Sequence, residues 1–354
     1  MHRLVSPGAF TLVAQRRLQN IRRASVPSEP PGPLLWPGLS AWRQGGHNRG
    51  RRWSADGSGE PEDCAEADAC ELPGSLAECG RLVLCTPSPA EKAKLTHAAF
   101  NAWCSGSLPL GSAEAPAVPA RPQLPRLVAA KDVPTPAKSP LPLPAHLLHG
   151  LLHVELNAVD LAWDTVVRFS GEKMPRQFFS DFLRVADDES RHLLWCLQRM
   201  AELQHSYGDL PAHNVLWEGA TVSAGDVAMR LAIVPCVQEA RGLDAGPRIA
   251  ERLVGAGDCR TAAIVRRISE EEHAHVAVGV AWLHHVAAAR CSTARELFRS
   301  ALGSHYPDGL RGAASFNVNA REKVGVMRDW WAPSTELEGR LRGIVEAETA
   351  AAAC

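Results

Sequence analysis

The chain has 354 residues, 22% of them charged and 45% hydrophobic, which is enough for a folded domain with a substantial core. No apolar run approaches the ~18 residues of a membrane-spanning helix, and ten cysteines are too few for a small disulfide-stabilised scaffold. Nine of the 38 Lys and Arg residues but only one of the 39 Asp and Glu residues fall within 1–55, so the remainder is acidic and does not favour a nucleic-acid surface.

The first 28 residues have the composition of a targeting segment. Residues 1–28 contain five Arg and no Asp or Glu, and single apolar residues alternate with the basic ones. An amphipathic, acid-free, Arg-containing start is typical of an organelle transit peptide, and it lacks the central apolar block of a secretory signal. We expect import into mitochondria, with plastids as the alternative. The other reading is a basic tail with no role in import.

Residues 29–73 are rich in Pro and Gly and show no hydrophobic period, which predicts a disordered linker. Four cysteines lie in and just after this segment, at Cys64, Cys70, Cys79 and Cys85. They contain no Cys-x-x-Cys pair, so free thiols are favoured over a zinc site.

Between 74 and 144 the pattern predicts short helices followed by an extended strap. The apolar spacing over 76–103 allows two helices divided at Pro87–Pro89. Ten prolines within 107–144 exclude a helix or a central strand there.

From 145 to 290 the chain reads as a four-helix bundle. Apolar residues recur at spacings of three and four, the helical period, over four segments. The predicted helices are 145–169, 176–205, 224–242 with an interruption near Pro235, and 260–289; a short helix over 247–255 precedes the last. The fold class is therefore all-α, a four-helix bundle preceded by the Pro-rich strap. Residues 291–354 are expected to form a C-terminal helical extension with a disordered tail.

Each long helix carries a carboxylate on its apolar face. The hydrophobic stripes place Glu155 inward on the first helix and Glu239 inward on the third. The second and fourth helices each place a Glu-x-x-His pair inward, Glu189 with His192 and Glu272 with His275. Since unpaired buried carboxylates are costly, four of them facing one core need a common cationic partner.

The order Glu, Glu-x-x-His, Glu, Glu-x-x-His is the ligand set of ferritin-like di-iron and di-manganese bundles. Residues three apart share a helical face, so a Glu can bridge two metals while the His binds one. The alternative is that these pairs are solvated faces or helical salt bridges. On the fourth helix Glu270 and His273 form an overlapping pair, and the stripe favours Glu272 and His275 over them.

Other polar residues on these helices have weaker signals. His149 and His153 precede Glu155 and are either exposed or packing residues, or groups that support the metal site. Tyr207 lies in a Gly-Asp-Leu-Pro loop, which favours a structural role over a radical site. Arg241 either pairs with a carboxylate of the site or caps a helix end.

Several motifs together resemble the ferritin-like family catalogued as domain of unknown function 455 (DUF455), over about 75–333. The motifs that carry the resemblance are Arg121-Pro-Gln-Leu-Pro-Arg-Leu-Val128, His153-Val-Glu-Leu-Asn-Ala-Val-Asp160, Asp188-Glu-Ser-Arg-His192, Tyr207-Gly-Asp-Leu-Pro-Ala-His213, Glu239-Ala-Arg-Gly-Leu-Asp244, His275-Val-Ala-Val-Gly279 and Phe316-Asn-Val-Asn-Ala-Arg321. The resemblance implies the same six ligands that the periodicity selects. His273 departs from the family pattern, which has an apolar residue there. The family is more distantly similar to the di-iron hydroxylase that acts on a modified adenosine in transfer RNA.

These observations predict a protein that binds two iron ions, or iron and manganese, and activates dioxygen as a hydroxylase or oxidase. The expected substrate is a small molecule or an RNA base, and the expected electron donor is a separate reductase. No dinucleotide-binding fingerprint follows a predicted strand. The chain is expected to be a monomer or dimer without a membrane partner. The alternatives are a ferroxidase or iron-binding protein, and a bundle with structural metal that serves as a binding scaffold.

Overall fold

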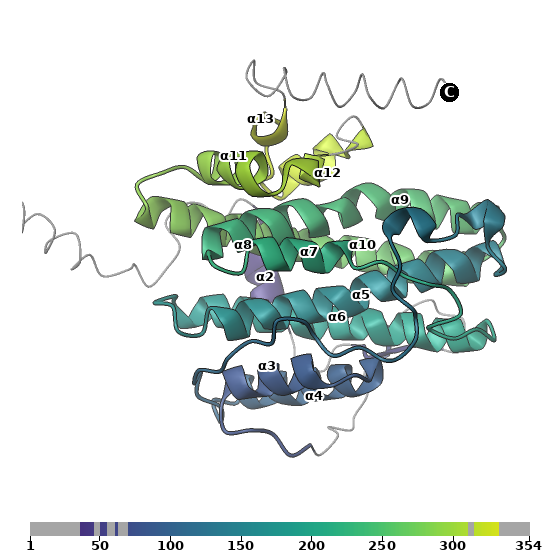
Figure 1. Ribbon diagram of the computed structural model, residues 1–354, viewed down its shortest axis with the longest axis horizontal. Helices are drawn as coiled ribbons and strands as arrows, with labels where there is room; N and C mark the ends of the chain where they lie inside the picture. The colour runs from purple at the N-terminus through teal and green to yellow at the C-terminus, as the bar shows by residue number, and fades with distance from the viewer. Residues whose placement is uncertain (1–35, 46–49, 55–60, 63–69, 311–314, 333–354) are drawn as a thin grey trace, which may run out of the picture.

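The computed structural model describes residues 36–45, 50–54, 61–62, 70–310 and 315–332. Its centre is an all-α bundle of long helices that run side by side (Figure 1), as the sequence predicted. These are α5 (Leu143–Arg168), α6 (Arg176–Glu202), α10 (Cys259–Ala289) and a fourth rod made of α8 (Val227–Ile233), η3 (Val234–Glu239) and α9 (Ala240–Gly255). None of the described helices is both long and apolar enough to cross a membrane.

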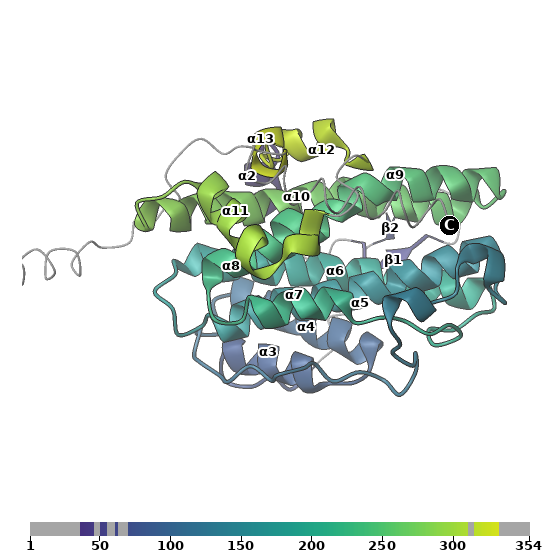
Figure 2. The ribbon, with the colours of Figure 1, turned by 45° about the horizontal axis from the view of Figure 1, so that its top comes forward.

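Helices α3 (Leu76–Cys85) and α4 (Pro89–Cys104) cover the outer side of α5 and α6 (Figures 1 and 2). Each begins at a serine whose hydroxyl accepts a backbone hydrogen bond three residues on, and Pro89 occupies the first helical turn of α4. Because α5 is covered on this side too, every residue from Glu155 to Val167 is buried. Gly80 allows the close approach, since a Cβ there would lie 2.5 Å from the Trp163 ring.

The predicted strap follows α4 as an extended segment. Within 105–142 the structure has only the short turns η1 (Ala130–Asp132) and η2 (Pro136–Lys138) and one bridge between Leu127 and Ala212. Arg121 ties the strap to α5 through an ion pair with Asp160 and a 2.8 Å hydrogen bond to Asn157.

The expected interruption near Pro235 takes the form of a π-helix, η3, and the rod continues through it. Proline lacks the amide that an α-helical turn requires, and a π-helical segment accommodates this loss without breaking the rod. Gly279 of α10 faces Pro235, and a Cβ at Gly279 would lie 2.3 Å from its ring. The expectation of a separate helix over 247–255 is wrong: these residues belong to α9, whose Pro247 lies on the exposed face.

The expectation of a disordered linker over 29–73 is wrong for part of that segment. Helix α2 (Leu39–Gln44) docks on the bundle with Leu39 and Trp42 buried, and β1 (Arg52–Trp53) pairs with β2 (Pro61–Glu62). Trp53 packs edge-on against Trp195 of α6. Two buried indoles supply enough apolar contact to fix a segment whose composition shows no period. The predicted transit peptide and Cys64 lie outside the described residues.

Two further regions complete the bundle. Helix α7 (Val215–Val222), which the sequence analysis missed, lies between α6 and α8 in the chain. The C-terminal extension is helical as predicted, with α11 (Ala294–His305), the turn η4 (Pro307–Leu310), α12 (Val318–Lys323) and α13 (Arg328–Trp331). Arg321 of α12 fixes the extension to α9 through a 2.6 Å ion pair with Asp244. The predicted disordered tail falls largely on 333–354, outside the described residues.

Candidate metal centre

The structure brings together all six residues that the sequence selected. They come from four elements: α5, α6, η3 and α10. Five are buried and Glu239 is half-buried. The predicted set is Glu155, Glu189, His192, Glu239, Glu272 and His275.

The six residues form two overlapping groups, and within each group one ligand atom from every residue lies within 4.8 Å of the others. The first group, here called the Glu155 site, contains Glu155, Glu189, His192 and Glu272; the second, the Glu239 site, contains Glu189, Glu239, Glu272 and His275. Glu189 and Glu272 belong to both groups. This is the arrangement that two bridging carboxylates between neighbouring cations require.

Both imidazoles present the same nitrogen to the carboxylates. His192 Nδ1 lies 3.2 Å from Glu189 Oε2 and 3.4 Å from Glu155 Oε2. His275 Nδ1 lies 2.8 Å from Glu189 Oε1 and 3.6 Å from Glu272 Oε2. Each His therefore offers Nδ1 as a ligand atom and leaves Nε2 for another partner.

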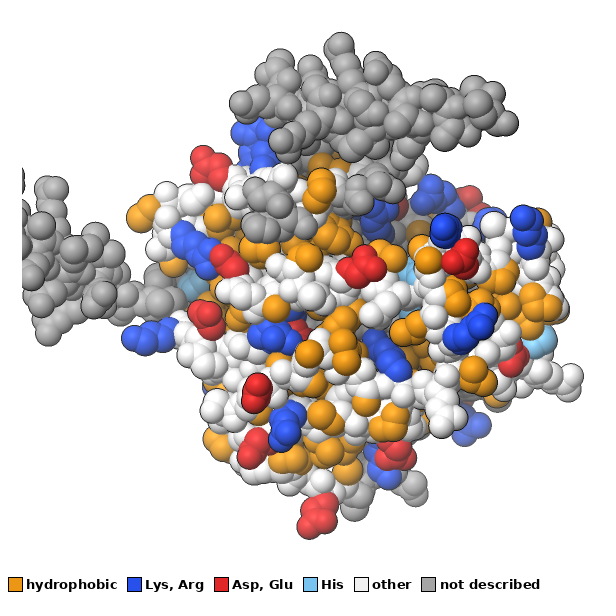
Figure 3. Space-filling view, in the orientation of Figure 1, with side chains coloured by type: hydrophobic (Ala, Val, Ile, Leu, Met, Phe, Trp, Pro, Cys, Tyr) orange, Lys and Arg blue, Asp and Glu red, His pale blue; other side chains and the backbone are white. Residues whose placement is uncertain are grey.

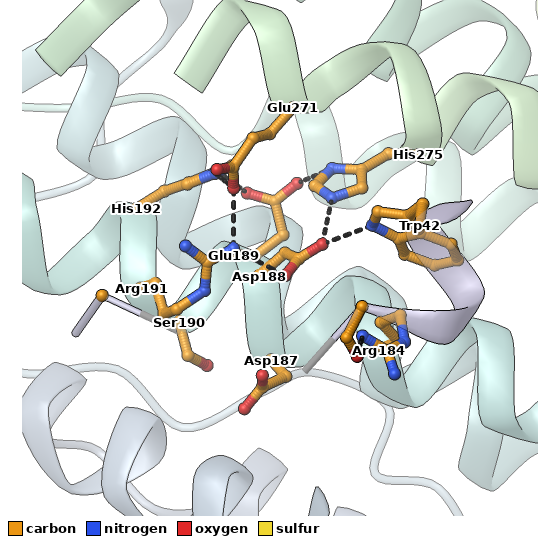
Figure 4. A network of polar contacts seen from close by, with 12 residues as sticks. Trp42, Arg184, Asp187, Asp188, Glu189, Ser190, Arg191, His192, Glu271 and His275 are labelled. Atoms are coloured by element: carbon orange, nitrogen blue, oxygen red, sulfur yellow. Dashed lines mark hydrogen bonds and ion pairs between the residues drawn. The ribbon is translucent and has the colours of Figure 1, made fainter. Parts of the chain in front are cut away.

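That other partner is a second carboxylate in each case (Figure 4). His192 Nε2 lies 3.1 Å from Glu271, and His275 Nε2 lies 3.4 Å from Asp188. Arg191 donates to both, at 2.6 Å to Asp188 and 2.7 Å to Glu271. A carboxylate on the far nitrogen fixes the tautomer and orientation of a ligating His and raises its basicity.

Trp42 extends this layer to the N-terminal segment. Its indole N–H donates a 2.7 Å hydrogen bond to Asp188, and its ring meets His275 edge-on (Figure 4). Helix α2 therefore contacts the centre through a residue that the sequence analysis assigned to a linker.

Helical periodicity selects neither Asp188 nor Glu271 as a site residue, although Asp188 lies within one of the family motifs. A signal was present: an acidic residue precedes each Glu-x-x-His pair, Asp188 before Glu189 and Glu271 before Glu272. The support is crossed, because Asp188 of α6 contacts His275 of α10, whereas Glu271 of α10 contacts His192 of α6.

The pKa values of the six residues are shifted because four carboxyl groups and two imidazoles are packed together without a cation. Burial and the charge of Glu189 raise the pKa of Glu155 well above its usual value and that of Glu239 to about 8. Burial opposes ionisation of Glu189 too, but the two imidazoles lower its pKa. Hydrogen bonds and charges from the carboxylates outweigh burial and raise the pKa of His192 and of His275. In the absence of cations, protons on these carboxyl and imidazole groups neutralise the cluster, and bound cations would replace them.

The residues present fit two divalent cations. Glu155 Oε2, Glu189 Oε1 and His275 Nδ1 are buried and make no hydrogen bond of acceptable geometry. Such atoms are rare in protein interiors and are expected where a metal is bound. Four carboxylates also balance the charge of two divalent ions, and a mixed carboxylate–imidazole set suits iron and manganese.

The other candidates do not join the centre. Glu270 is exposed, and His273 Nδ1 lies near backbone carbonyls of its own helix, so the overlapping pair faces away. His153 lies 2.7 Å from the Tyr207 hydroxyl, and His149 Nε2 accepts a hydrogen bond from the Gly208 amide. These two histidines hold the loop after α6. Among the described cysteines, none belongs to a group that could hold a metal.

A cavity of about 430 Å³ adjoins the cluster between α5 and α9. Glu155, Glu189, Glu239 and Glu272 line it, whereas His192 and His275 do not. The carboxylate side of the centre therefore faces the cavity, and the imidazole side faces the supporting acids. Most other lining residues are aliphatic or glycine; the polar ones are His146, His213, Gln238, Arg241 and Ser269.

Comparisons with known proteins agree with the motifs. The sequence profile of a family described as "Protein of unknown function (DUF455)" matches residues 85–332, which is more than half of the chain. A Haemophilus influenzae protein described as "Uncharacterized protein" is 35% identical over 223 residues, covering 60% of this chain and 76% of its own. No solved structure matches.

Proposed function

The chain belongs to the DUF455 family of proteins of unknown function, and from that premise we propose that it is a dinuclear metal oxidoreductase that uses dioxygen to hydroxylate or oxidise an organic substrate. The metals would be two iron ions, or iron and manganese, held by Glu155, Glu189, His192, Glu239, Glu272 and His275. A bound pair of ferrous ions supplies two electrons and open coordination positions for dioxygen.

The observation that carries the proposal is the position of the cavity. It meets the centre on the side of Glu155, Glu189, Glu239 and Glu272, away from the two histidines of the set. A catalytic metal site keeps positions open toward its substrate, whereas a structural site is closed by protein ligands. The placement therefore supports catalysis over a purely structural metal.

The chain's own residues have distinct roles in this proposal. Glu189 and Glu272 belong to both sites and would be shared by the two metals, whereas Glu155 and Glu239 would each bind at one site. Asp188 and Glu271 orient the imidazoles and hold the proton on each Nε2, and Arg191 fixes both acids. The largely aliphatic cavity wall would surround the reacting atoms with apolar groups.

A ferroxidase is the second candidate, because the ligand set alone would oxidise ferrous iron. The cavity argues against it, since a route for hydrated Fe²⁺ needs polar walls and most of this lining is aliphatic.

We further propose that electrons come from a separate reductase and that the Arg-containing residues 1–28 direct the chain to mitochondria.

The test is anaerobic reconstitution of the full chain with ferrous iron, followed by metal analysis and an optical spectrum on exposure to air. The full chain is needed because Trp42 contacts the centre. We expect about two irons per chain and a transient visible band. No iron, or one tightly held zinc, would overturn the proposal.

Matched variants on α10 locate the site. Glu272→Gln and His275→Ala should reduce bound iron while helicity by circular dichroism is retained. Glu270→Gln and His273→Ala alter the same residue types on the outward face and should still bind two irons. Equal iron content in all four variants would contradict the ligand assignment.

A further inference from the structure

The shape of the cavity limits what the substrate can be, whichever metals are bound. On α5 the lining residues run from His146 to Leu161 at helical spacings of three and four, so they form one continuous face of that helix. At 1.5 Å per residue this face is about 22 Å long. A cavity of about 430 Å³ that follows such a length is long and narrow.

Small residues explain why the space stays open. Gly242 and Gly246 bring α9 close to α10: a Cβ would lie 3.3 Å from Glu272 at the first position and 2.4 Å from Ser269 at the second. Helix α9 is thus drawn toward α10 and leaves a gap on its α5 side. In that gap Gly150 of α5 lines the cavity, and a Cβ there would meet no atom within 4 Å.

Away from the metal centre the wall of the cavity is mainly apolar. Leu147, Leu151 and Val154 line one part of α5, and Ile249 and Ile268 face them from α9 and α10. Glu155 lies within the α5 face, about 13 Å from His146 and 9 Å from Leu161 by helix rise. The reactive side of the centre therefore meets the middle of the cavity, away from both of its ends.

We propose that this cavity binds a straight, predominantly apolar ligand of the fatty-acyl type and that one of its interior methylenes is hydroxylated there. One C–H bond would be replaced by a C–OH bond, with one oxygen atom of dioxygen entering the ligand and the other leaving as water, while the separate reductase supplies two electrons and solvent two protons. This inference rests on the proposed function for the oxidation step, but the binding step does not depend on it. An apolar groove of this length is filled best by a flexible chain, because each buried methylene adds to affinity.

A nucleobase fits the cavity less well. RNA recognition relies on aromatic stacking, on hydrogen bonds to base edges and on positive charge for the phosphates. Among the described residues that line the cavity, none is aromatic apart from two histidines, and Arg241 is the one Lys or Arg. On the face shown in Figure 3, basic side chains lie scattered among acidic and apolar ones.

The test is displacement of a fluorescent fatty acid from the full-length apo protein by straight-chain acids from octanoic to stearic. Affinity should rise about fourfold per added methylene until the cavity is full, and then stop rising. Gly150→Phe should place a ring in the cavity and shift this plateau to shorter chains. Gly303→Phe is the matched control: Gly303 is also helical, a Cβ there also meets no atom within 4 Å, and it lies outside the cavity.

The outcomes separate this inference from the proposed function. If the fatty acids failed to bind, or if the two variants gave equal plateaus, the assignment of a fatty-acyl ligand would be overturned even where two irons are bound. If the fatty acids bound but the protein took up no iron, the proposed function and the oxidation step would be overturned instead. With Mn²⁺ in the centre, nuclear relaxation should broaden interior methylene signals more than the terminal methyl; the reverse order would refute oxidation at an interior position.

Discussion

Each histidine of the candidate centre is contacted by a carboxylate from the other helix, α6 or α10. This crossed arrangement predicts which of the two metals each carboxylate would stabilise. Asp188 contacts His275, which belongs to the Glu239 site and not to the Glu155 site. Glu271 contacts His192, which belongs to the Glu155 site and not to the Glu239 site. Asp188→Asn should therefore weaken the metal at the Glu239 site, and Glu271→Gln the metal at the Glu155 site. Each substitution keeps the shape of the side chain and removes its charge.

The expected magnitude follows from the contacts that are lost. Removing a carboxylate behind a ligating His lowers metal affinity by about 10–100-fold, or about 1.4–2.8 kcal/mol. Asp188→Asn should lie at the upper end of this range, because Asp188 also accepts from Trp42 at 2.7 Å and pairs with Arg191 at 2.6 Å. The fold should survive, since Arg191 keeps its 2.7 Å bond to Glu271.

The assay is an anaerobic Co²⁺ titration followed optically, with a competing chelator to resolve two successive binding constants. Asp187→Asn is the control, because Asp187 is buried on the same helix but pairs with His97 of α4, away from the centre. One of the two constants should fall in each variant and neither in the control. Loss of both metals in parallel, or unchanged constants, would refute the crossed arrangement.

Three further predictions follow from single contacts. Trp42→Phe removes the indole hydrogen bond that ties α2 to the bundle, at a cost of about 1 kcal/mol, so amides in 39–44 should exchange hydrogen faster; unchanged exchange would contradict the docking. Gly279→Ala should destabilise by about 1–3 kcal/mol in urea unfolding, because its Cβ would lie 2.3 Å from Pro235, whereas Gly150→Ala, with no atom within 4 Å, should not destabilise. Since the pKa of Glu239 is raised to about 8, metals must displace its proton, and affinity should fall as pH drops from about 8 to 6; a flat profile would contradict this.

The cluster of four Glu and two His was predictable because these six residues obey the helical period. Glu155 and Glu239 sit where aliphatic residues would continue an inward stripe, and Glu-x-x-His places both side chains on one face. Helical phase also separates Glu272 from Glu270, which the structure places on the exposed surface. Helix periodicity thus carries enough information to choose between neighbouring acids.

The supporting layer was not predictable from periodicity, because it depends on how helices cross. Asp188 lies one residue before an inward ligand, and its partner His275 lies 87 positions further along the chain. Trp42 is 146 positions away from Asp188, in a segment with no period at all. The cavity likewise arises from glycines that draw α9 toward α10, and a glycine reads in the sequence only as a weak helix former.

The crossed contacts also bear on how the site assembles. If each acid supported the His of its own helix, a single helix could preorganise half of the ligands before the bundle formed. Here neither His is oriented until α6 and α10 have packed, and Arg191 then bonds the acids of both helices at once. Metal affinity is therefore coupled to packing of these two helices, and metal binding should stabilise the bundle more than it stabilises either helix alone.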